Sequence, residues 1–117
     1  MSGKKRTDFS ANEDISLRLE FTGGSEFLLT DDQQKELLDL IKVPGFESPF
    51  TISSLLEWID GYLLKDCDNS EMFVKDGELR PGILVLVNEC DWELLDGLHS
   101  ELKNGDKVTF ISTLHGG

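Results

Sequence analysis

The hydrophobic positions along the chain form four segments with distinct patterns. Apolar and polar residues alternate strictly over residues 15–21, which predicts a half-buried strand. Residues 51–65 carry apolar side chains at helical spacing, which predicts an amphipathic helix with Thr51 as its N-cap. Residues 83–87 are an unbroken apolar run of strand length, expected to be buried on both faces. Residues 107–112 predict the last strand, directly after a tight turn.

One segment is ambiguous. Residues 31–42 contain good helix formers and read locally as a helix, yet residues 37–43 also fit a strand that leads into a turn at Pro44-Gly45. Residues 72–75 predict a short strand, and residues 91–94 predict one helical turn that Asp91 caps. One main helix with four or five strands predicts an α+β fold, in which the helix covers one face of the sheet.

Composition and charge exclude several classes of function. The 117 residues contain 11 basic and 23 acidic side chains, a net charge of -12, which argues against direct nucleic-acid binding. No apolar run approaches the roughly 20 residues that a membrane-spanning helix needs. Residues 1–14 lack the apolar stretch of a secretory signal and are expected to form a flexible tail. We therefore expect no membrane contact.

The cysteines and histidines indicate neither a metal site nor a disulfide framework. Cys67 and Cys90 lie far apart in the sequence, and His99 and His115 are not at ligand spacing from them. Few cysteines and no secretory signal predict a reducing compartment, and hence a cytoplasmic protein that could also enter the nucleus. No phosphate loop, nucleophile elbow or other catalytic motif is present in the sequence.

The candidate chemical group is the end of the chain. The predicted last strand runs directly into Thr113, Leu114, His115, Gly116 and Gly117. Two residues without Cβ atoms make a thin segment that can enter a narrow channel. The carboxylate behind them is ionised at neutral pH and could attack the α-phosphate of ATP, which would give an acyl adenylate. A frayed or truncated terminus would explain the same residues without any function.

Several motifs resemble those of one family. The chain resembles the eukaryotic ubiquitin-related modifiers over residues 15–117. Ubiquitin differs in having an arginine-rich tail before its glycines. The motifs that carry the resemblance are Glu20-Phe21 with Gly23-Gly24, Leu55-Leu56 with Trp58-Ile59, Arg80-Pro81-Gly82-Ile83-Leu84-Val85-Leu86-Val87-Asn88, Asp91-Trp92-Glu93-Leu94, and Phe110-Ile111-Ser112-Thr113-Leu114-His115-Gly116-Gly117.

The resemblance implies a ubiquitin-like β-grasp domain over residues 15–112, followed by a flexible tail at 113–117. It implies a mixed sheet of four or five strands whose first and last strands are adjacent and parallel, covered by the helix at about 51–65. It also implies that residues 37–43 form the second strand, with residues 30–36 as a loop or short helical turn. This interpretation sets aside the local helical pattern of residues 31–42.

The same resemblance implies a carrier and not an enzyme. An activating enzyme with adenylation and rhodanese-like domains would use ATP and Mg²⁺ to convert Gly117 into a thiocarboxylate. That sulfur would pass to a tRNA thiolation enzyme complex, which modifies wobble uridine, and the activated Gly117 could also form an isopeptide bond with lysines of target proteins. Thr113, Leu114, His115 and Gly116 would guide the tail into the activating enzyme. We expect a monomer without a bound cofactor.

Two alternatives stay open from the residues. The chain could be the small sulfur-carrier subunit of molybdopterin synthase, in which the tail inserts into a large catalytic subunit. It could also be a non-conjugating ubiquitin-like binding module, with Trp92 as an anchor because tryptophan is enriched at binding hot spots. The plain alternative for Trp92 is packing beside the last strands. His115 could take part in acid–base chemistry instead of threading, since an imidazole titrates near pH ~6.5.

Overall fold

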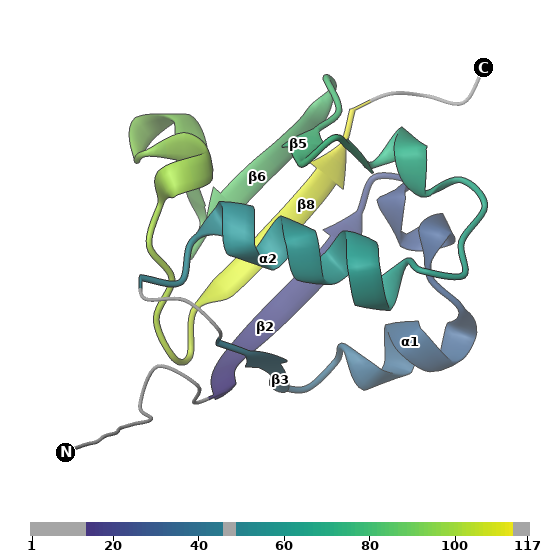
Figure 1. Ribbon diagram of the computed structural model, residues 1–117, viewed down its shortest axis with the longest axis horizontal. Helices are drawn as coiled ribbons and strands as arrows, with labels where there is room; N and C mark the ends of the chain where they lie inside the picture. The colour runs from purple at the N-terminus through teal and green to yellow at the C-terminus, as the bar shows by residue number, and fades with distance from the viewer. Residues whose placement is uncertain (1–13, 46–48, 114–117) are drawn as a thin grey trace, which may run out of the picture.

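The computed structural model describes residues 14–45 and 49–113. It consists of a five-stranded sheet with α2 (Ile52–Trp58) and the π-helical turn η3 (Ile59–Leu63) lying across one face (Figure 1). The sheet order is β3 (Ile41–Pro44), β2 (Asp14–Thr22), β8 (Lys107–Ser112), β6 (Ile83–Val87) and β7 (Cys90–Asp91). The shorter elements are η2 (Ser25–Leu28), α1 (Asp31–Glu36), η4 (Ser70–Met72), η5 (Trp92–Leu94), η6 (Gly97–His99) and a two-stranded ribbon of β4 (Val74–Lys75) and β5 (Glu78–Leu79).

The first and last long strands lie side by side at the middle of the sheet. β2 pairs parallel with β8, from Arg18 opposite Lys107 to Thr22 opposite Ile111. β8 also pairs antiparallel with β6, so that it has a strand on each side. This arrangement and the covering helix confirm the predicted β-grasp fold.

The main helix forms where its capping residues and apolar stripe predict it. Thr51 accepts a hydrogen bond from the Ser54 backbone N–H at 3.3 Å, and the Ser54 hydroxyl accepts one from the Thr51 N–H at 3.2 Å. This reciprocal pair satisfies two backbone donors at the helix start. The predicted stripe is buried in full and consists of Ile52, Leu55, Leu56, Ile59 and Leu63.

Aromatic side chains fill the space between the helix and the sheet. The Phe110 ring lies 5.1 Å from the Phe21 ring and 5.1 Å from the Phe73 ring, centroid to centroid. Phe110 and Phe73 are fully buried. This cluster joins the two central strands to the segment that follows the helix, and so it supports the position of β8.

The predicted second strand begins four residues too early. Residues 37–40 are not in a strand, and β3 starts at Ile41. Residues 31–36, predicted as part of a loop or short helical turn, form the helix α1, in which Thr30 and Gln33 cap each other. Leu37 keeps an α-helical backbone, and its N–H is bonded to the Gln33 carbonyl at 3.0 Å. The local helical pattern was therefore right for residues 31–36.

A second correction concerns the burial of β6. Val85 and Val87 point into the core, but Leu84 and Leu86 are only half-buried, because no layer covers the other face of the sheet in the described part of the chain.

Of the other short elements, the predicted strand at 72–75 is present over two residues, and Asp91 caps η5 by accepting from the Glu93 N–H at 2.9 Å. Within residues 14–45 and 49–113, no helix is long and apolar enough to cross a membrane.

Candidate functional site: the root of the C-terminal tail

The tail leaves the sheet from its central strand. β8 ends at Ser112, where the predicted domain boundary lies, and Thr113 follows at once. Hydrogen bonding to β2 on one side and β6 on the other fixes β8 along its whole length. The tail therefore starts from a rigid base, although Leu114, His115, Gly116 and Gly117 lie outside the described residues.

Thr113 is held to the turn that precedes β6. Its backbone N–H donates to the Gly82 carbonyl at 2.7 Å, and its hydroxyl donates to the same oxygen at 2.5 Å. The Gly82 backbone has a φ of 91°, a conformation that glycine adopts without steric cost. These two bonds orient the first tail residue, while the Thr113 side chain stays exposed.

The turn after β2 encloses the other side of the tail root. Ser25 is buried, and its hydroxyl lies within hydrogen-bonding distance of two carbonyl oxygens, those of Thr22 at 2.8 Å and Phe110 at 3.2 Å. Gly23 has a φ of 71° and sits against Ser112, with the Ser112 nitrogen only 3.1 Å from where a Cβ would be. The root is thus bounded by two glycine turns that are far apart in the sequence.

Replacing Gly23 by alanine is expected to destabilise the protein and displace the tail root. The left-handed backbone conformation would cost alanine about 1–2 kcal/mol. The added methyl would also overlap the Ser112 carbonyl, which costs about 1–3 kcal/mol more. Urea unfolding measures the loss. Gly77→Ala is the matched control, because Gly77 has a φ of 80° with open space around it. Equal losses in both variants would contradict the close packing at Gly23.

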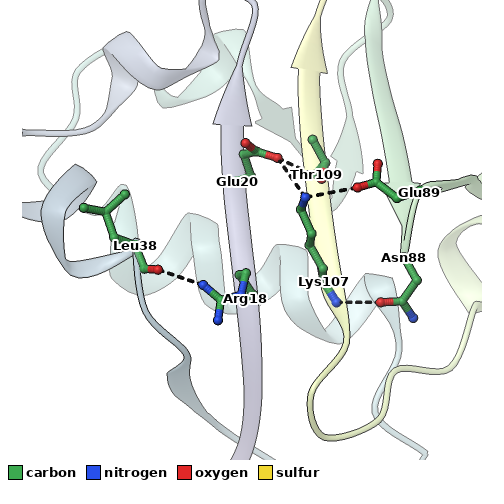
Figure 2. Close-up of polar contacts among 7 residues, drawn as sticks. All are labelled: Arg18, Glu20, Leu38, Asn88, Glu89, Lys107 and Thr109. Carbon is green, nitrogen blue, oxygen red and sulfur yellow. Dashed lines mark hydrogen bonds and ion pairs between the residues drawn. The ribbon is translucent and has the colours of Figure 1, made fainter.

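The uncovered face of the sheet is polar along β2 and the start of β8 (Figure 2). The Lys107 ammonium lies 3.0 Å from the Glu89 carboxylate and 3.5 Å from the Glu20 carboxylate. The hydrogen bond that the Lys107 ammonium donates to Glu89 and the negative charge of Glu20 raise the pKa of Lys107 above its usual range. The Thr109 hydroxyl lies 3.4 Å from Glu20 and completes the row.

The same face becomes apolar beside the tail root. Leu84 on β6 stands opposite Ile111 on β8, and Leu86 stands opposite Thr109. These positions alternate with the buried Val85 and Phe110, so they belong to the face away from α2. A half-buried apolar patch, here defined as Leu84, Leu86 and Ile111, therefore lies next to the point where the tail begins.

The described residues contain little that could perform catalysis by itself. Cys67 and Cys90 are half-buried free thiols, and no group of three or more His, Cys, Asp or Glu side chains in residues 14–45 and 49–113 is arranged to hold a metal ion. Trp92 is half-buried and packs against the core, which is the plain alternative predicted for it. Gly23 and Gly82 stood in the sequence analysis only as members of quoted motifs. The parallel pairing of β2 with β8 brings Gly23 to the tail root, and the antiparallel pairing of β6 with β8 brings Gly82 there.

A sheet of this topology with a helix across one face, and a chain end that leaves its central strand, defines a ubiquitin-like protein. The model of the family Urm1 (Ubiquitin related modifier) matches residues 16–117. Ubiquitin-related modifier 1 from Bos taurus is 50% identical over 103 residues, which is 88% of this chain and 96% of that protein. The human protein of the same name is 48% identical over 103 residues, with the same coverage of 88% of this chain and 96% of that protein.

A solved structure shows the same relationship. The solution structure of Urm1 from Trypanosoma brucei is 35% identical, covers 93% of this chain and all of its own, and superposes with a TM-score of 0.59. The chain therefore belongs to the Urm1 family. It is a ubiquitin-like modifier and sulfur carrier and not a catalyst itself. The family carries sulfur without a bound cofactor and interacts with activating enzymes.

Proposed function

We propose that Gly117 is the residue that carries the sulfur. The family match extends to this residue, and the central strand leads to it through a root that is fixed at Thr113. The tail root carries the proposal, because it gives the last four residues a defined starting point on a rigid body. Gly116 gives clearance, and Thr113, Leu114 and His115 guide the tail into a partner.

The chemistry takes place on an activating enzyme with adenylation and rhodanese-like domains. The Gly117 carboxylate attacks the α-phosphorus of ATP, with Mg²⁺ bound to the nucleotide, and pyrophosphate leaves. A persulfide on the rhodanese-like domain attacks the acyl carbon, and AMP leaves. A thiol then cleaves the sulfur–sulfur bond, which leaves a thiocarboxylate on Gly117 and a disulfide on the partner. Each step breaks one bond for each bond formed, and this chain supplies only the acyl group.

The surface of the chain supports this division of work. The apolar patch of Leu84, Leu86 and Ile111 lies beside the tail root, where an activating enzyme that holds the tail would also contact the body. Burial of such side chains contributes roughly 25 cal/mol per Å² of apolar surface. The net charge of -12 favours a carrier that delivers sulfur without binding tRNA itself.

From the thiocarboxylate, sulfur passes to a tRNA thiolation enzyme complex that modifies wobble uridine. The same activated Gly117 acylates lysines of target proteins through an isopeptide bond, since an acyl adenylate or thiocarboxylate derivative is open to attack by an amine. Both roles place the protein in the cytoplasm, with the nucleus accessible to a chain of 13.1 kDa.

Intact mass spectrometry tests the proposal directly. The chain is incubated with its activating enzyme, ATP, Mg²⁺ and a persulfide donor, and its mass is expected to rise by the difference between sulfur and oxygen. Tandem fragmentation should place the change on Gly117. Omission of ATP should leave the mass unchanged. A mass increase that maps to Cys67 or Cys90, or no increase with an enzyme that is active on another carrier, would refute the assignment.

A further inference from the structure

A groove of about 650 Å³ runs along the edge of β2 on the side of β3, away from the tail root. A volume of this size is typical of ligand-binding clefts. β2 forms one wall and α1 the other, and the floor includes the buried Leu29 and Leu37. The charged residues around it are Arg18, Glu20, Glu26, Asp31, Lys35 and Lys107.

The wall opposite β2 is held in place by side-chain amides of α1. The Gln33 side chain donates to the Leu63 carbonyl at 2.8 Å, which ties α1 to η3. The Gln34 side chain donates to the Glu26 carbonyl at 3.0 Å and to the Leu29 carbonyl at 3.3 Å. These bonds keep the groove open without a ligand, so binding there costs little ordering of the protein.

The β2 wall presents an unused strand edge. Within residues 14–45 and 49–113, the strand on this side of β2 is β3, whose pairing stops at Leu17 opposite Ile41. The Arg18 N–H points the other way, to Asp106 next to β8. Because successive backbone groups of a strand point to opposite sides, the N–H and C=O of Leu19 and Phe21 face the groove. Such an edge is a template for another strand.

The side chains along this edge alternate in charge on the uncovered face. Arg18 and Glu20 are exposed there, whereas Leu19 and Phe21 point into the core. Figure 2 shows Arg18 reaching from β2 towards the segment that follows α1, where its Nη1 donates to the Leu38 carbonyl at 2.8 Å. Among the residues that the structure describes, this is the one acceptor bonded to the Arg18 side chain, which leaves four of the five guanidinium N–H groups for another acceptor. The edge therefore favours a binding segment in which apolar and charged residues alternate.

We propose that the groove binds an extended peptide segment of a partner protein, which adds to the sheet as an antiparallel strand beside residues 18–21. Addition of a strand to a sheet edge is a common mode of peptide recognition, in which the backbone gives affinity and alternate side chains give specificity. An antiparallel segment continues the hydrogen-bonding pattern that β3 makes with β2.

Cross-strand pairing defines the sequence of this segment. In the antiparallel direction its residues lie in turn opposite Phe21, Glu20, Leu19 and Arg18. The residues opposite Phe21 and Leu19 point to the core side, where Leu29 and Leu37 require apolar side chains. The residues opposite Glu20 and Arg18 point to the uncovered face, where opposite charges stabilise the pair. The preferred order is thus apolar, basic, apolar, acidic.

This interaction is separate from sulfur transfer, since no group at the tail root lines the groove. The experiment is a titration of the full ¹⁵N-labelled chain with the acetylated and amidated peptide Ser-Val-Lys-Val-Glu-Ser. The amide resonances of Leu19 and Phe21 are expected to shift and to become protected from hydrogen exchange. Exchange of Lys and Glu in the peptide should weaken binding about tenfold, because two favourable pairs become unfavourable.

Variants of the protein and of the peptide separate the two parts of the recognition. Arg18→Glu combined with Glu20→Lys should reverse the preference between the two peptides. Lys103→Glu combined with Glu101→Lys, the same net-neutral exchange of charges at an ion pair outside the groove, should not. Methylation of both valine nitrogens removes the donors to Leu19 and Phe21 and should abolish binding. Unchanged binding of the methylated peptide, or shifts confined to the apolar patch, would overturn the proposal.

The free chain provides one more decisive result. If the Leu19 and Phe21 amides exchange rapidly in the dilute chain, the edge is open as proposed. Protection in the dilute chain would mean that these amides are already closed off within the same chain, and protection that grows with protein concentration would mean a second copy. Either result would contradict a groove kept for a partner. Loss of peptide binding would leave the mass shift at Gly117 unaffected, so the two proposals fail independently.

Discussion

A chain that lacks Gly117 is expected to fold normally and to accept no sulfur at all. The tail starts from Thr113, which is fixed to Gly82, so loss of one residue withdraws the terminal carboxylate by about 3.3–3.6 Å. A misplacement of 1 Å in a reacting group can lower the rate by about 100-fold. The shortened tail would therefore not reach the α-phosphorus of ATP. Pyrophosphate exchange on the activating enzyme and intact mass measure the loss.

The control for this truncation is Gly61→Ala. Gly61 is exposed in η3 and has open space around it, so the substitution removes a glycine without touching the tail. This variant should be activated at the rate of the unchanged chain. Sulfur transfer to the truncated chain at a comparable rate would mean that the length of the tail beyond Thr113 does not determine whether the carboxylate reaches ATP. The proposed role of the tail root would then be wrong.

The largest effect on stability is expected from Phe110→Ala, with a loss of about 3–5 kcal/mol in the free energy of unfolding. Phe110 is fully buried on the central strand and contacts the rings of Phe21 and Phe73. Its removal opens a cavity where the two central strands meet the helix layer. Because small domains have a free energy of unfolding of only about 5–15 kcal/mol, this substitution would remove a large part of it.

Urea unfolding followed by tryptophan fluorescence or circular dichroism measures this loss. Phe27→Ala is the matched control, since Phe27 is 82% exposed and its truncation should change the stability by less than about 0.5 kcal/mol. Equal transition midpoints for the two variants would contradict the described packing. We also expect Phe110→Ala to slow activation at temperatures where part of the chain is unfolded, because the tail then has no fixed base.

Periodicity predicted the parts of the fold in which one face is buried. The alternation from Ile15 to Phe21 and the stripe from Ile52 to Leu63 each place a continuous set of side chains in the core, so a shift of register would expose them. Residues 37–40 carried no such constraint. Leu38 and Leu40 are exposed, and the Leu38 carbonyl is bonded to Arg18 instead of to a strand. Apolar character there did not mean a strand.

The candidate site could be predicted only in part, for a related reason. The glycines at the end of the chain identified the chemistry, but the contacts at the tail root join Gly23 and Ser25 to Ser112 and Phe110, almost ninety residues away. A local pattern in the sequence cannot reveal a contact between residues that are so far apart along the chain. The groove beside β2 was missed for the same reason, because it exists only where β3 begins as late as Ile41 and α1 takes the place of a longer strand.

The parallel pairing of β2 with β8 has a consequence during synthesis. The middle of the sheet cannot form until residues 107–112 have left the ribosome, so β2 lacks its main partner while all the residues between the two strands are synthesised. Long-range pairings of this kind fold slowly and leave apolar surface exposed in the meantime. Chains that stop before Lys107 cannot close the sheet and lack the proposed sulfur-carrying residue, so the fold and the reactive chain end are completed together.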